Sequence, residues 1–196
     1  SGSSVSSKVE NLIELLDSFR SCILCDHSNQ IWQYLNKLKK LKLSNNGSNN
    51  IRIDIVLDNC SIELAADLIF CDFLLRNNFV DQIYLHGKPY FWFISDVTKH
   101  DFDYLMRQIQ SSNSLSLNNF YKRINKYLKE SKLVLDFSNY FWNSPYPFSQ
   151  MEAIVPEFYN ELKEKSFLVV MKGDLNYRKL IGDLDWPYET PLRVAV

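Results

Sequence analysis

The spacing of hydrophobic positions changes near residue 50 and predicts two regions. Before that point, apolar residues recur at helical intervals, so we expect two helices between residues 9 and 41, with a break at residues 26–29. Residues 44–50 carry turn-forming side chains only, which is typical of a surface loop or a linker. The pattern predicts a helical N-terminal segment over residues 1–43, a linker over residues 44–50 and an α/β core over residues 51–196.

Strand-length apolar runs alternate with amphipathic segments from residue 51 onward. Residues 51–57 predict a strand, and Ser61 is placed to cap a helix over residues 62–74. Residues 80–86 predict a second strand. A strand, a helix and a strand in this order form a βαβ unit, which implies a parallel pair with a right-handed crossover.

The alternation continues to residue 171. We predict a strand over 91–96, a helix over 98–110, a polar loop over 111–118, a helix over 120–131, a strand over 133–137, a helix over 156–162 and a strand over 166–171. The fold class that fits this order is α/β, a three-layer α/β/α sandwich with a mainly parallel Rossmann-like sheet, preceded by a short helical segment.

Length, composition and charge exclude several classes of protein. With 196 residues and 46% hydrophobic side chains, the chain can bury the core of one domain, with at most an appendage. Its 22 basic and 23 acidic residues give a net charge of −1, so no overall basic field attracts nucleic acid. No uncharged apolar run approaches the roughly 18 residues of a membrane span. Four cysteines without a dense spacing pattern favour reduced thiols. We expect a cytoplasmic protein without nucleic-acid or membrane partners, whose oligomeric state the sequence leaves open.

Acidic residues follow three of the predicted strands. Asp58 comes after the first, Asp96 closes the third and Asp174 follows the last. Asn59 is next to Asp58. Because the carboxyl ends of parallel strands meet at one rim of the sheet, we expect these side chains to lie close together. Their mutual repulsion favours a bound divalent cation, and oxygen-only ligands favour Mg²⁺ or Mn²⁺. An alternative stays open, because turns favour Asp and Asn through local hydrogen bonds alone.

The helix after Asp58 adds a second feature to this rim. The backbone amides of residues 60–63 open that helix, so they direct N–H groups and the positive end of its dipole toward the rim. They could receive a phosphate oxygen. A cation site next to a helix N-terminus suits a phosphate ester as the ligand.

Several segments of the core occur in an order that is typical of one enzyme family: residues 57–64, 67–69, 72–74, 86–88, 92–102 and 172–183. Together they resemble the signature of the metal-dependent damage-control phosphatases, first catalogued as domain of unknown function family eighty-nine. Within that family the chain is most similar to the branch of acidic-residue methyltransferase-like proteins, which dephosphorylate sugar phosphates.

The resemblance implies roles for particular residues. Asp58, Asn59 and Asp96 are expected to bind a divalent metal ion, with Mn²⁺, Mg²⁺, Co²⁺ and Ni²⁺ as candidates, and Asp58 and Asp96 are the expected catalytic residues. The expected substrate is a small phosphorylated metabolite such as a sugar phosphate. The residues expected to bind it are Asp58, Asn59, Glu63, Asp96, Lys172, Gly173, Asp174, Leu175 and Asn176.

The chain departs from the family pattern in three respects. Cys60 and Ser61 stand where the family commonly has Ala and Gly, and Ser61 narrows the approach of the backbone to a ligand. The family also has a basic Arg-Thr-x-Lys motif that holds the phosphate, beyond the point that corresponds to Val196, and a longer helical region that caps the pocket. We therefore expect a fragment of a longer protein, in which residues 1–43 are the remnant of the cap and the core is truncated at its C-terminal end.

The expected mechanism is in-line attack by a water that the metal ion orients, while Lys172 and the helix amides neutralise the developing charge. A competing mechanism makes Asp58 a covalent nucleophile, although such enzymes usually place a second Asp two residues on, where this chain has Cys60. Two other functions stay open: a non-catalytic α/β binding or regulatory module, and a protein-carboxylate methyltransferase that uses S-adenosylmethionine. The methyltransferase has less support, because none of the five glycines forms a G-x-G pattern.

Other candidate sites have simpler explanations. Cys22 and Cys25 have the spacing of a zinc knuckle but lie on a helical pattern and lack a second pair of ligands at matching spacing. His100 fits the first turn of a helix, with a proton shuttle as the alternative, and His86 ends a strand and is expected to be structural. The lysines within residues 37–42 fit a solvated helix face.

Overall fold

The structure is a computed structural model that describes residues 14–15, 17–44 and 50–196. Its contacts divide the chain into two compact units, Ser1–Lys37 and Leu38–Val196, and each is described by itself. Much of the first predicted helix and most of the predicted linker lie outside the described residues. The expected domain boundaries therefore stay predictions.

Helix α2 (Ser28–Ser44) confirms the second helix predicted for the N-terminal region. A short 3-10 helix, η1 (Arg20–Cys22), precedes it. Between them, the carboxylate of Asp26 accepts the backbone N–H of Ser28 at 2.8 Å. The predicted break therefore lies where a local hydrogen bond starts the next helix.

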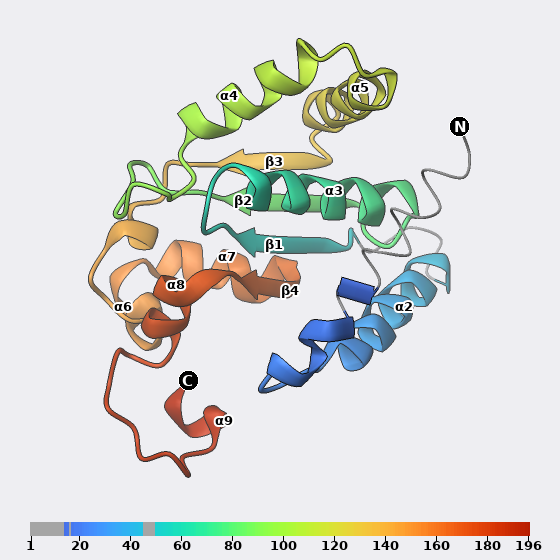
Figure 1. The fold of residues 1–196 in the computed structure, drawn as a ribbon. Helices are drawn as coiled ribbons and strands as arrows, with labels where there is room; N and C mark the ends of the chain where they lie inside the picture. Colours follow the sequence, from blue (N-terminus) through green and yellow to red (C-terminus); the bar gives the residue numbers. More distant parts are fainter. Residues whose placement is uncertain (1–13, 16, 45–49) are drawn as a thin grey trace. The chain divides into compact units, whose positions relative to one another are not determined.

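A parallel sheet is the centre of the second unit. Its strands in the described residues are β1 (Arg52–Val56), β2 (Gln82–His86), β3 (Leu133–Asp136) and β4 (Ser166–Met171). Their order is β3-β2-β1-β4, and every pairing is parallel (Figure 1). The parallel sheet that the sequence predicts is confirmed, and the carboxyl ends of all these strands lie at one rim.

Helices cover both faces of this sheet. Figure 1 shows α3 (Ile62–Arg76) on one face, whereas α7 (Pro156–Lys165) lies on the other. These layers confirm the predicted sandwich, and β1, α3 and β2 form the predicted βαβ unit. The remaining helices are α4 (Lys99–Gln110), α5 (Leu115–Lys129), η2 (Tyr140–Asn143), η3 (Phe148–Gln150), α6 (Met151–Ile154), α8 (Gly173–Leu180) and α9 (Leu192–Ala195). Within the described residues, no helix has both the length and the apolar character that crossing a membrane requires.

Alternation along β1 builds a hydrophobic layer on each face of the sheet. Successive side chains of a strand point to opposite faces. Ile53 and Ile55 are buried toward α3. Val56 points to the other face, where it packs in a cluster with Phe141, Trp142, Met151 and Leu162. The rim is therefore held on a strand that is packed on both sides.

The prediction of a strand over residues 91–96 is wrong. This segment forms bends and turns after β2, and Ile94 is 92% exposed. The carboxylate of Asp96 accepts the backbone N–H groups of Trp92 and Phe93, each at 2.7 Å. These local bonds take the place of a strand ladder. Asp96 consequently reaches the rim from a loop and not from a strand end.

Two further local predictions need correction. Helix α5 begins at Leu115, inside the predicted polar loop, because Ser114 caps it by accepting the N–H of Leu117. Ser61 precedes α3 with φ 65° and ψ −127°, and its side chain makes no capping hydrogen bond within the described part of the chain. A capping residue needs extended backbone angles, which Ser61 does not have.

Candidate active site

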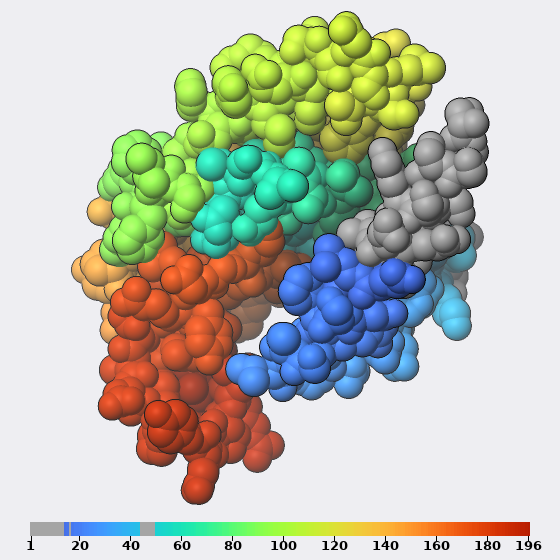
Figure 2. All heavy atoms as spheres, viewed as in Figure 1, coloured from blue at the N-terminus to red at the C-terminus, as the bar shows by residue number. Residues whose placement is uncertain are grey.

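Three segments that are distant in sequence meet at the carboxyl-end rim: the residues after β1, the loop after β2 and the start of α8. Asn59 and Asp96 form an isolated antiparallel bridge, in which the N–H of Val97 donates to the carbonyl of Asp58 at 2.9 Å. Figure 2 shows the start of α3 in cyan next to the loop in light green, with the α8 region in orange-red below them. Asp58 and Asp96 therefore lie close together, as the sequence predicts, although a bridge between loops brings them there.

Asp96 is fixed from two sides. Its Oδ1 accepts a hydrogen bond from Lys88 Nζ at 2.7 Å, and its Oδ2 accepts the two loop amides described above. Asp96 is 3% exposed and Lys88 is 2% exposed. A carboxylate has about four lone-pair sites, so one site on Oδ1 remains for a further ligand.

Asp58 lies in an acidic environment. It is buried, and burial raises the pKa of its carboxyl. The charge of Lys88 opposes this rise, whereas the charges of Glu63, Asp174 and Asp96 add to it and raise the pKa further. Ionisation of a carboxyl group in this position costs free energy, and a bound cation would offset that cost.

Asn59 connects the acidic residues on the α3 side. Its Nδ2 donates to Asp58 Oδ2 at 2.8 Å and to Glu63 Oε2 at 3.1 Å. Because these bonds use the N–H groups of the amide, its oxygen is the atom that can still act as an acceptor or a metal ligand.

Lys172 binds carboxylates of α3. Its Nζ is 2.6 Å from Glu63 Oε1 and 2.7 Å from Asp67 Oδ2. Burial lowers the pKa of Lys172, but the hydrogen bonds to Asp67 and Glu63 outweigh burial and the pKa is raised. The ammonium predicted to neutralise phosphate charge is therefore already neutralised by two carboxylates.

Gly173 is the point at which the start of α8 touches Asp58. Its φ is 83°, and a Cβ at this position would lie 2.0 Å from Asp58 Oδ2. Only glycine fits here without displacing the carboxylate. The exposed side chain of the next residue, Asp174, adds the negative charge that acts on Asp58.

Leu175 and Asn176 are buried in the first turns of α8. Leu175 lines a cavity of about 300 Å³ whose walls include Trp92 and Phe93. Asn176 Nδ2 donates to the carbonyl of Lys172 at 2.7 Å, while its Oδ1 is buried without a partner in the described residues. Asn176 thus holds the backbone that presents Gly173 to the site.

The helix N-terminus offers fewer amides than the sequence predicts. The N–H of Cys60 donates to the carbonyl of Ser95 at 2.8 Å, so it is used by the loop bridge. The amides at the first positions of α3 remain, and the first four N–H groups of a helix have no partner inside it.

The donor set fits a hard divalent cation. Within the described residues, no three His, Cys, Asp or Glu side chains form a metal-binding group. The candidate set instead combines the carboxylates of Asp58 and Asp96 with the amide of Asn59. Such oxygen ligands suit a cation that keeps several waters. The raised pKa of Asp58 fits a site that gains from a positive charge.

The sequence analysis missed two buried lysines. Lys88 lies within a segment of the family resemblance, and a lysine two residues after a strand at the acidic rim is a usable signal. Lys179 is 6% exposed and donates to the carbonyls of Phe141 at 2.7 Å and Ser144 at 2.8 Å. Burial, together with the charge of Lys88, lowers the pKa of Lys179 to about 8.

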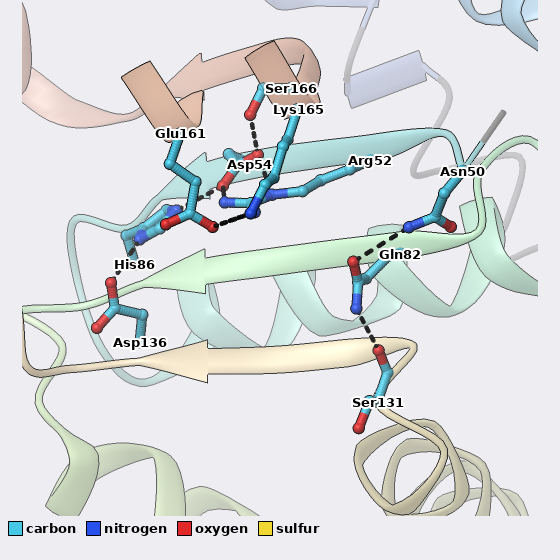
Figure 3. Close-up of polar contacts among 10 residues, drawn as sticks. All are labelled: Asn50, Arg52, Asp54, Gln82, His86, Ser131, Asp136, Glu161, Lys165 and Ser166. Carbon is cyan, nitrogen blue, oxygen red and sulfur yellow. Dashed lines mark hydrogen bonds and ion pairs between the residues drawn. The ribbon is translucent and has the colours of Figure 1, made fainter. Parts of the chain in front are cut away.

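A buried ionic network lies on the α7 face of the same strands (Figure 3). Asp54 Oδ1 is 2.6 Å from Arg52 Nη2 and 2.7 Å from His86 Nε2. The other ring nitrogen of His86 is 3.2 Å from Asp136 Oδ2, and Arg52 also binds Glu161 of α7 at 2.7 Å. The expected structural role of His86 agrees with this position between two carboxylates.

The remaining candidates belong to different units of the chain, with Cys22 and Cys25 in the first and His100 in the second. Cys22 and Cys25 are exposed free thiols, and Cys25 Sγ is 3.3 Å from His27 Nδ1. His100 is exposed in the first turn of α4, as the sequence predicts.

Comparisons with known proteins identify the family. The family model of the damage-control phosphatase ARMT1-like domain matches residues 2–196. The damage-control phosphatase ARMT1 of Mus musculus is 37% identical over 196 residues, which are 100% of this chain and 43% of that protein. The Homo sapiens protein of the same name is 35% identical over 196 residues, with the same coverage of both chains. The Xenopus laevis protein is 36% identical over 197 residues, which are 100% of this chain and 44% of that protein. The chain therefore spans less than half the length of these relatives, and it belongs to the damage-control phosphatase ARMT1-like domain family.

Proposed function

We propose that this chain carries the core of a metal-dependent phosphatase that hydrolyses small phosphorylated metabolites such as sugar phosphates. The observation that carries the proposal is the backbone bridge between Asn59 and Asp96. It brings the carboxylates of Asp58 and Asp96 and the amide of Asn59 together next to the start of α3. Family membership supports the same reading, because the relatives are named damage-control phosphatases.

Asp58, Asn59 and Asp96 would hold the divalent cation, with Mn²⁺, Mg²⁺, Co²⁺ and Ni²⁺ as candidates. When bound, it supplies positive charge that polarises a phosphoryl group and acidifies water. The amides at the start of α3 bind a phosphoryl oxygen. Gly173 leaves room for the carboxylate of Asp58. This carboxylate can then orient a water for in-line attack on phosphorus. In the competing route the carboxylate of Asp58 itself attacks phosphorus. Both routes therefore require Asp58.

The test measures phosphate release from a panel of sugar phosphates by the full-length protein, first treated with a chelator and then supplied with each metal ion. We expect turnover with at least one of them. Asp58→Asn and Asp96→Asn should lower it by about a hundredfold or more. Asp103→Asn is the matched control, because this exposed carboxylate pairs with Lys99 on α4, and it should leave turnover unchanged.

Three outcomes would contradict the proposal. Undiminished release by Asp58→Asn would remove both routes. Stoichiometric Mn²⁺ binding without release from any phosphate ester would indicate a binding or regulatory module. Methyl transfer from S-adenosylmethionine to protein carboxylates, without phosphate release, would indicate the methyltransferase.

We also propose a cytoplasmic location. In the described part of the chain the four cysteines are free, which agrees with a reducing compartment. Fractionation of cells that express the full-length protein tests this, and recovery in a secreted fraction would contradict it.

A further inference from the structure

Lys88 is a buried cation in the candidate active site that the mechanism above does not use. It follows Gly87, where a Cβ would lie 2.0 Å from the ring of Phe137, so the backbone packs tightly at this point. The N–H of Lys88 donates to the carbonyl of Val97 at 3.0 Å, which fixes the backbone to the loop. The side chain is 3% exposed and its Nζ donates to Asp96.

The ammonium of Lys88 has more N–H donors than it has hydrogen-bond partners within the described residues. A lysine ammonium has three N–H donors. Within the described residues, Asp96 Oδ1 is the hydrogen-bond partner of Nζ, at 2.7 Å, so two N–H groups remain. Unsatisfied donors on a buried charged group are costly, and an anion that accepts them would remove the cost.

The two lysines of the site differ in the charges they face. Lys172 binds two carboxylates, whereas Lys88 binds one. The charge of Lys88 also acts on the carboxyl of Asp58, so the ammonium is near both predicted metal-binding carboxylates. A phosphate bound next to these carboxylates would therefore lie near the ammonium of Lys88.

We propose that Lys88 binds the phosphoryl group of the substrate, with one N–H on Asp96 and the others on phosphoryl oxygens. This inference rests on the proposed function, since it concerns the same site. It assigns the phosphate-facing cation of this chain to Lys88 and gives Lys172 the role of joining the end of β4 to α3. Charge-assisted hydrogen bonds to phosphate in a buried site are among the stronger polar contacts.

The test is calorimetric titration of inorganic phosphate into the full-length protein, with and without Mn²⁺. It compares the wild type, Lys88→Met and the control Lys99→Met, whose lysine is exposed and pairs with a carboxylate on α4. We expect Lys88→Met to bind phosphate about ten- to a hundredfold more weakly, because a charge-assisted contact is lost. Lys99→Met should bind phosphate like the wild type.

A crystal structure of the wild type with phosphate gives a second readout that does not depend on how the variants fold. We expect a phosphate oxygen within about 3 Å of Lys88 Nζ. A Nζ that contacts Asp96 alone, or unchanged phosphate affinity in Lys88→Met, would overturn the inference, as would a wild type that binds no phosphate. Phosphate binding through Lys88 without turnover of any ester would contradict the proposed function and leave the inference standing.

Discussion

Gly173 packs against the carboxylate of Asp58 so closely that a methyl group at this position would lie 2.0 Å from Oδ2. We predict that Gly173→Ala displaces this carboxylate and weakens Mn²⁺ binding, measured by calorimetry on the full-length protein. The positive φ adds a loss of stability of about 1–2 kcal/mol.

Gly182→Ala is the matched control for Gly173→Ala. Its φ of 73° is also positive, but a Cβ there would meet Leu184 at an ordinary 3.5 Å and no site residue. It should lose similar stability and keep Mn²⁺ affinity. Equal affinity in both variants would contradict the role given to Gly173.

Ser61 has backbone angles that suit glycine. Its φ of 65° with ψ of −127° is a region that other residues rarely adopt. We predict that Ser61→Gly raises the free energy of unfolding by about 1 kcal/mol, because it removes this strain. Urea denaturation measures the change. Ser111→Gly, at a position with φ −78°, has no strain to remove and should give no gain.

The buried ring of His86 predicts a pH-dependent stability. Burial lowers its pKa, but the hydrogen bonds to Asp136 and Asp54 outweigh burial, and the pKa is raised above its ordinary value of 6.5. A group whose folded pKa is raised contributes stability that is complete below its unfolded pKa and is lost as the pH rises through the folded pKa. The stability that the wild type has over His86→Gln should therefore be constant below about pH 6 and shrink at higher pH. Urea denaturation across this range measures it, and a difference that grows with pH would contradict the prediction.

Substitutions of Asp54 and Glu161 test how much the network of Figure 3 contributes to stability at its centre and at its edge. Asp54 is fully buried between Arg52 and His86 and also accepts the hydroxyl of Ser166. Asp54→Asn leaves buried positive charge without its partner, so we expect a loss of about 3–5 kcal/mol in the free energy of unfolding.

Glu161→Gln is the control for the network, because the side chain of Glu161 is 36% exposed where it binds Arg52. Its loss should be within about 1 kcal/mol. Equal losses in the two variants, measured by urea denaturation at neutral pH, would show that burial does not decide the contribution of each carboxylate.

The strands that the sequence predicts correctly are those with a clear local pattern of apolar residues. The apolar runs at residues 51–57, 133–137 and 166–171 became strands because each is a short apolar run of strand length. The run at residues 91–96 has a similar pattern but formed a loop. Its amides bind the carboxylate of Asp96, a local competitor that hydrophobic spacing does not reveal.

By itself, the sequence determined the layered parallel α/β fold and the candidate residues Asp58, Asn59 and Asp96, since strand length, turn residues and motif order are properties of consecutive residues. Tertiary structure alone decided that a bridge between loops joins Asn59 to Asp96 and that Lys172 faces α3. It also decided that Lys88 is buried against Asp96. The physical reason is that burial and the pairing of charges depend on residues brought together from distant parts of the chain, and no local spacing encodes which ammonium meets which carboxylate.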